Sequence, residues 1–205
     1  MKKITLPGLI LGAVAAFAPL AARAQTPAET SLPARPGYLR LGLGTSYDNI
    51  GYYRCARLSL EYAPMLSRRI GLASRLVGAA GKPWGNGLET QLPNQNYKAV
   101  YLEQEVVFYP FGNDRRLNLG VGGGGFAGYY WRNSYHSLQG VNGRVTKYEL
   151  ASGQGGHAGY LFSLNLDVAL GQSHRWRLGA KSTVQNGLGG NTTTPTHNLT
   201  LARRL

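Results

Sequence analysis

The stretch that decides the fold is residues 159–170, GYLFSLNLDVAL. Large apolar side chains occupy every second position, from Tyr160 and Phe162 to Leu170, and small or polar side chains such as Ser163 and Asp167 occupy the positions between them. A period of two places these two sets on opposite faces of a β-strand. The stretch therefore predicts a strand with one apolar face and one small, polar face.

Seven further segments repeat this alternation, and they bring the number of candidate strands to eight. They are residues 38–47, 55–64, 70–80, 97–110, 117–131, 176–184 and 198–205. No apolar run after residue 36 is long enough for a transmembrane helix, and no stretch shows a convincing helical period. Strands, and not helices, are expected to organise the chain.

The connections between these segments alternate in length. Short turns are expected at residues 64–69, 111–116 and 171–174, a brief connection at 48–53, and long polar loops at 82–96, 132–156 and 187–196. Short turns on one rim and longer loops on the other are typical of a transmembrane barrel, whose wall must close because lipid cannot satisfy an open sheet edge. We therefore predict an all-β fold, an eight-stranded, antiparallel, up-and-down, closed transmembrane β-barrel formed by residues 37–205.

The amino-terminal region carries an export signature. Lys2 and Lys3 precede an uncharged stretch, residues 4–22, which ends in an Ala-x-Ala sequence at residues 22–24. This order is that of a secretory signal peptide, so residues 1–24 are expected to be cleaved. Residues 25–36, which contain three prolines, are expected to form a linker.

The polar face of the strands is rich in glycine and serine, and it also carries charges. Small side chains fit the interior of a narrow barrel, whereas a surface in contact with water has no need of them. The charged residues on this face are nearly balanced, which predicts an ion-paired interior without an open pore. They are Arg40, Arg57, Arg75, Arg177 and Lys181 against Glu61, Glu103, Glu105 and Asp167. A proton or ion path through them is the alternative, and a soluble lipocalin-like barrel that binds an apolar ligand is the alternative to a membrane barrel.

The remaining positive charge gathers in the short turns and at the chain end. Arginines of this rim are Arg68, Arg69, Arg115, Arg116, Arg175, Arg203 and Arg204. The chain has a formal net charge of +13, but an exported protein with its cations in turns is not expected to bind nucleic acid. We expect the rim to face the periplasm and to contact anionic lipid phosphates; ordinary solvated basic turns are the alternative reading.

The exported start, the eight alternating segments and the aromatic residues near strand ends resemble the small eight-stranded outer-membrane barrels of Gram-negative bacteria, the OmpA/OmpX-like group. The aromatic residues expected to form an interfacial girdle are Tyr47, Tyr109, Tyr129, Trp131 and Trp176. The chain departs from the group at its last residue, Leu205, where such proteins usually end in an aromatic residue. The resemblance implies an outer-membrane location, contact with membrane lipid and lipopolysaccharide, insertion by the barrel-assembly machinery, and a monomeric state.

Motifs for catalysis or cofactors are weak in this sequence. The glycine run at residues 120–125 matches a nucleotide-binding pattern but leads into no helix. His136 next to Ser137, and His157 above Ser163, would be the candidates for a lipid-modifying enzyme. Adjacent residues on an extended chain point to opposite faces, which separates His136 from Ser137, and no acidic partner is evident beside His157. Cys55, the one cysteine, excludes a disulfide scaffold and is expected to fill space.

No catalytic, metal-binding or cofactor-binding residue is therefore predicted. The expected function is that of a non-enzymatic outer-membrane protein of structural or surface-interaction type. Its extracellular loops, with Trp84, Tyr135 and Tyr148 among their residues, would make the contacts.

Overall fold

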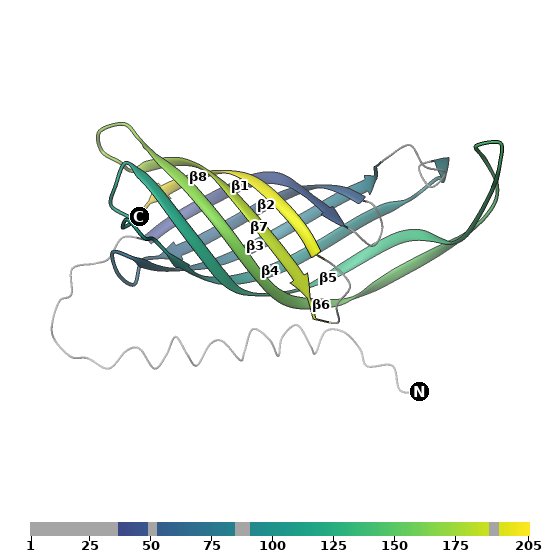
Figure 1. The fold of residues 1–205 in the computed structure, drawn as a ribbon, viewed down its shortest axis with the longest axis horizontal. Coiled ribbons are helices and arrows are strands. Elements are labelled where there is room, and N and C mark those ends of the chain that lie inside the picture. The colour runs from purple at the N-terminus through teal and green to yellow at the C-terminus, as the bar shows by residue number, and fades with distance from the viewer. Residues whose placement is uncertain (1–36, 49–52, 85–90, 189–192) are drawn as a thin grey trace. The chain divides into compact units, whose positions relative to one another are not determined.

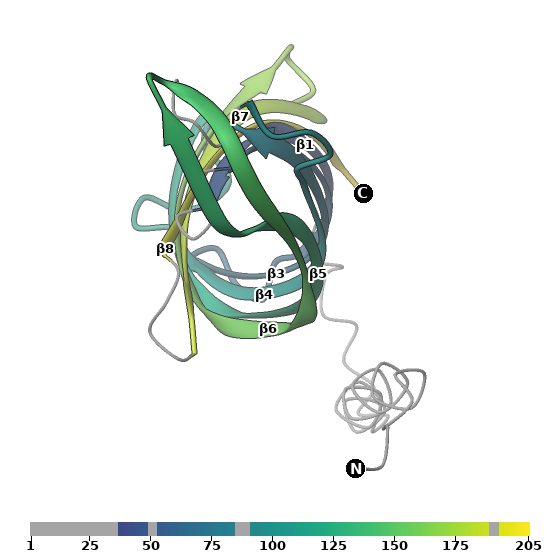
Figure 2. The same cartoon turned by 90° about the vertical axis from the view of Figure 1, so that its right-hand side faces the viewer.

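The computed structural model describes residues 37–48, 53–84, 91–188 and 193–205, and it shows eight antiparallel strands. The strands are β1 (Gly37–Asp48), β2 (Tyr53–Pro64), β3 (Ile70–Pro83), β4 (Asn96–Phe108), β5 (Leu117–Val141), β6 (Arg144–Leu170), β7 (Trp176–Gly187) and β8 (Thr193–Arg204). Each strand pairs with the next, and β8 closes the barrel by pairing with β1 (Figures 1 and 2). The predicted all-β, eight-stranded, up-and-down barrel is confirmed.

The predicted signal peptide, residues 1–24, and the predicted linker, residues 25–36, lie outside the described residues. In the ranges that are described, no helix is long and apolar enough to cross a membrane.

The two faces of each strand have different chemistry. On β2, burial alternates without interruption from Tyr53 to Ala63. Leu58 and Leu60 keep 54% and 50% of their surface exposed on the outer face, whereas Glu61 keeps only 2% on the inner face. Because the pattern recurs on the other strands, large apolar side chains cover the outside of the wall, and polar, small and aromatic side chains line most of the inside.

The segment predicted as a long loop, residues 132–156, is instead a β-hairpin. Strands β5 and β6 continue through it and extend well beyond the other strands (Figure 1). Asn142 and Gly143 form the two-residue turn with φ of 52° and 73°, the left-handed conformation that a type I′ turn requires. The loop prediction was wrong because this ribbon is solvated on both faces, so its sequence is polar although its two strands pair with each other, with two register shifts, up to the turn.

A second boundary also differs from the prediction. Strand β8 begins at Thr193, within the segment predicted as the loop 187–196. The short turns lie where the sequence indicated, and the two ends of the wall meet at their rim, where the amide of Leu205 donates a hydrogen bond to the carbonyl of Gly37 over 2.9 Å.

Gly124 has no room for a side chain between β5 and the backbone of β4. A Cβ atom at this position would lie 1.9 Å from the carbonyl oxygen of Gln104 and 2.8 Å from the Cα of Glu105, both backbone atoms. We expect Gly124→Ala to lower the free energy of unfolding by about 1–3 kcal/mol, because the two strands would have to separate. Denaturant titration of the protein in lipid vesicles measures the change.

The neighbouring Gly123 supplies the control for this prediction. A Cβ atom there would meet only the Phe162 ring, at 3.7 Å. Gly123→Ala is therefore expected to change the free energy of unfolding by no more than about 0.5 kcal/mol. Equal effects of the two substitutions would contradict the close approach at Gly124.

Candidate functional site

The barrel interior is divided into layers. A cluster of aromatic and small apolar side chains fills the half nearer the hairpin. A second apolar cluster, with Tyr38, Met65 and Tyr109 among its members, fills the half nearer the short turns. Charged residues form the layer between them.

Three carboxylates anchor the charged layer. Glu61 accepts from Arg40 Nη1 over 2.5 Å and from Lys181 Nζ over 3.0 Å. Glu103 lies 2.6 Å from Arg57 Nη2 and 2.6 Å from Arg75 Nη2. Glu105 accepts hydrogen bonds from Arg75 and, over 2.9 Å, from Lys181.

Some of these contacts join residues that face each other on neighbouring strands, and others span the lumen of the barrel. Glu61 and Arg75 face each other on β2 and β3, and Arg75 faces Glu103 on β4. Lys181 reaches Glu61 and Glu105 from β7, on another part of the wall. Each carboxylate therefore has at least two cations, which offsets the hydration that it loses inside the barrel.

The structure places all nine charged residues that the sequence singled out inside the barrel, each 5% exposed or less. It does not bring Asp167 and Arg177 together, although they flank the same turn. Asp167 instead contacts Arg40 Nη2 over 2.8 Å. Arg177 is the one member of the set for which no ion pair is found among the described residues.

The apolar layers were missed by the sequence reasoning. Tyr97, Tyr101 and Phe126 are buried inside the barrel, where the sequence led us to expect only polar and small side chains. Tyr109, expected in the outer aromatic girdle, is also inside and only 2% exposed. Its odd-numbered position matches those of Glu103 and Glu105 on the same segment, so the period of two contained the correct signal.

The seven rim arginines lie in the short turns and at the end of β8. Arg203 lies over the ring of Trp176, with 5.8 Å between the guanidinium carbon and the ring centroid. Arg68 Nε donates to Asp114 over 3.1 Å, and this hydrogen bond lowers the pKa of Asp114 below its ordinary value. The rim thus remains strongly basic, with Asp114 as the acidic residue of these turns.

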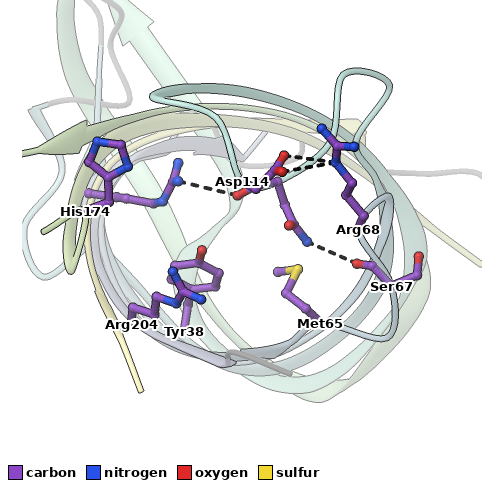
Figure 3. Close-up of a pocket in the computed structure, with 9 residues that line it drawn as sticks. Tyr38, Met65, Ser67, Arg68, Asp114, His174 and Arg204 are labelled. Atoms are coloured by element: carbon purple, nitrogen blue, oxygen red, sulfur yellow. Dashed lines mark hydrogen bonds and ion pairs between the residues drawn. The ribbon is translucent and has the colours of Figure 1, made fainter. Parts of the chain in front are cut away.

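A cavity of about 330 Å³ opens at the short-turn end of the barrel. Figure 3 shows Tyr38, Met65, Arg68, His174 and Arg204 around it. Arg177 and Asn113 also line it. Sequence reasoning did not predict this cavity, because the turns that surround it are distant in the chain.

The residues considered as candidates for a lipid-modifying active site do not form one site. His136 falls at a register shift of the hairpin, whereas His157 lies against the Phe126 ring, 5.1 Å between centroids. Ser163 donates its hydroxyl proton to Glu105 over 2.9 Å. In the part of the chain that the structure describes, no three potential metal ligands lie together where they could hold a metal ion, and Cys55 is buried.

No protein-family model and no curated protein matches the chain. Solved structures match its fold. Ail, the attachment invasion locus protein of Yersinia pestis, is 12% identical, with a TM-score of 0.56 over 83% of this chain and 99% of that one. OprG, an outer-membrane protein of Pseudomonas aeruginosa, is 10% identical, with a TM-score of 0.51 over 84% of this chain and 96% of that one. The chain therefore has the fold of the small eight-stranded outer-membrane barrels.

Proposed function

We propose that the protein is a monomeric, non-enzymatic barrel of the bacterial outer membrane that holds the β5–β6 hairpin at the cell surface. The observation that carries this proposal is the orientation of the wall. Large apolar side chains face outward on all sides, and eight of the nine interior charges named above, all but Arg177, form ion pairs within the described residues. A lipocalin-like soluble barrel requires the opposite arrangement, with its apolar face around the ligand.

The interior supports a structural role for the barrel and no open channel. Eight strands leave an interior just wide enough for side chains. The carboxylates of Glu61, Glu103 and Glu105 bridge cations from different parts of the wall, and apolar clusters lie on both sides of them. A solute would have to break several ion pairs to pass.

The β5–β6 hairpin supplies the surface for contacts. Tyr148 and Leu150 are 44% and 48% exposed on it, and its outer strand edges lie beyond the barrel wall. Exposed side chains and unpaired strand edges are both means of binding a partner protein. Ail, which has the same fold, is an attachment protein, so a barrel of this kind accommodates such a role.

The basic rim supports an orientation with the short turns in the periplasm. Guanidinium groups such as those of Arg69, Arg115 and Arg175 would bind phosphates of the inner leaflet, while their stems pack on the apolar wall. The opposite end of the wall would contact lipopolysaccharide, and the barrel-assembly machinery would insert the chain in this orientation.

Trypsin added to intact cells tests location and orientation together. We expect cleavage within the hairpin, after Arg132, Arg144 or Lys147, because this segment would be outside the cell. The rim arginines should be cleaved only after the outer membrane is permeabilised. Fragments are read on denaturing gels of the membrane fraction.

A variant in which Arg132, Arg144 and Lys147 are all Gln is the control, and it should resist external trypsin while remaining in the membrane fraction. Extraction of the wild-type protein by salt alone, without detergent, would overturn the proposed location. Protection of the hairpin in intact cells, with cleavage at the rim, would reverse the orientation.

A further inference from the structure

We infer that the cavity at the short-turn mouth of the barrel binds a small soluble oxyanion, a carboxylate or a phosphate monoester, through Arg177. This inference concerns a different part of the molecule from the hairpin, and it does not depend on the proposed contacts at the cell surface.

The guanidinium of Arg177 is held in place by hydrogen bonds, but only some of its hydrogen-bond donors have partners among the described residues. Its Nη2 donates to the backbone carbonyls of Arg115, over 2.9 Å, and Asn113, over 3.4 Å. Its Nε and Nη1 have no hydrogen-bond partner among the described residues, although the residue is only 3% exposed. The guanidinium carbon also lies 5.6 Å from the centroid of the Tyr38 ring. The group is thus fixed with two donor atoms still to be satisfied.

The ion pairs inside the barrel indicate which charge Arg177 would bind. Arg40, Arg57, Arg75 and Lys181 each have carboxylate partners, and their partners are the four acids that lie inside the barrel among the described residues. Arg177 is the fifth interior cation, and its two backbone partners are neutral. A buried cation is costly without an anion nearby, so a bound oxyanion would complete its surroundings.

The other residues of the cavity favour the same ligand. Arg68, Arg204 and His174 line it (Figure 3), and Arg177 is also part of its lining. Asp114 is the acid on its wall, and its charge is compensated by Arg68 at 3.1 Å. Arginine pairs well with carboxylate and phosphate groups because its planar donors match two oxygens at once.

The shape of the site favours a small solute over a lipid. The cavity holds about 330 Å³ and lies inside the ring of turns, whereas a lipid headgroup would approach the outside of the wall. Tyr38 and Met65, which belong to the second apolar cluster, near the short turns, form part of its lining. A short organic group attached to the oxyanion would pack against them.

Calorimetric titration of the full-length barrel in zwitterionic detergent, with inorganic phosphate and with acetate as probes, tests this site. We expect saturable binding that Arg177→Gln weakens about tenfold or more. Arg204→Gln, at an exposed residue on the cavity, should weaken it about two- to fivefold. Arg203→Gln is the matched control, because the adjacent Arg203 stacks outside the barrel on Trp176.

Each outcome decides between alternatives. No saturable binding by the wild-type protein, or binding by Arg177→Gln as tight as that of the wild-type protein, would overturn the site. Equal losses in Arg203→Gln and Arg204→Gln would assign the anion to the general charge of the rim. The titration is repeated in bicelles with and without phosphatidylglycerol, and competition by this lipid with inorganic phosphate would overturn the assignment to a soluble ligand. Heat-modifiable gel migration verifies that each variant is folded.

Discussion

Replacing Arg75 by Met is expected to lower the free energy of unfolding by about 3–5 kcal/mol, because removal of one partner leaves buried charges uncompensated. Arg75 contacts Glu103 at 2.6 Å, forms a hydrogen bond with Glu105 and lies 3.9 Å from Glu61. Among the described residues, no other interior cation contacts three carboxylates. Denaturant titration of the barrel in lipid vesicles, followed by tryptophan fluorescence, gives the difference.

Two variants make the result specific to the network. Arg116→Met removes an exposed arginine of the rim and should change the free energy of unfolding by no more than about 0.5 kcal/mol. The double variant with Arg75→Met and Glu103→Gln should lose less than the sum of the two single variants, because it removes a charge on each side of one contact. If Arg75→Met is as mild as Arg116→Met, the charged layer does not stabilise the barrel.

The orientation of the wall could be read from the sequence because it depends on a local property. Alternation along a strand decides which side chains share a face, and each of the nine interior charges follows from it. The glycine-rich inner face then distinguishes the interior from the exterior. These inferences require no knowledge of how distant strands meet.

The partners of each charge could not be read in the same way. Asp167 and Arg177 are close in sequence on either side of a turn, yet Asp167 contacts Arg40, 127 residues away. Such contacts depend on the stagger of the strands around the closed wall, which no single segment encodes. The mouth cavity was missed for the same reason, since Met65, Asn113 and His174 come from three different turns.

The hairpin, by contrast, could have been predicted from a local sequence feature, its turn dipeptide. Asn142-Gly143 is the dipeptide that most strongly favours a type I′ turn between two strands. Its polar flanks concealed the strands, because a ribbon in water on both sides lacks the apolar face that marks the barrel wall. Polarity there reflects exposure and not the absence of regular structure.

Placing an arginine on the outer face tests whether that face meets lipid. Leu164, in the barrel part of β6, is 52% exposed between Phe162 and Leu166. We expect Leu164→Arg to lower the free energy of unfolding in lipid vesicles by about 2–4 kcal/mol, because the guanidinium would have to be buried in hydrocarbon. The effect should appear as a lower denaturant midpoint and as a smaller inserted fraction.

Leu150 provides the matched control on the same strand. It is 48% exposed, nearly as much as Leu164, but it lies on the hairpin beyond the wall. Leu150→Arg should therefore change the free energy of unfolding by no more than about 0.5 kcal/mol. A barrel in water would tolerate both substitutions equally, since both leucines are half exposed and neither belongs to the packed interior. Only a hydrocarbon environment around Leu164 separates the two variants, so equal tolerance would reject the membrane-spanning wall even though the fold itself stayed closed.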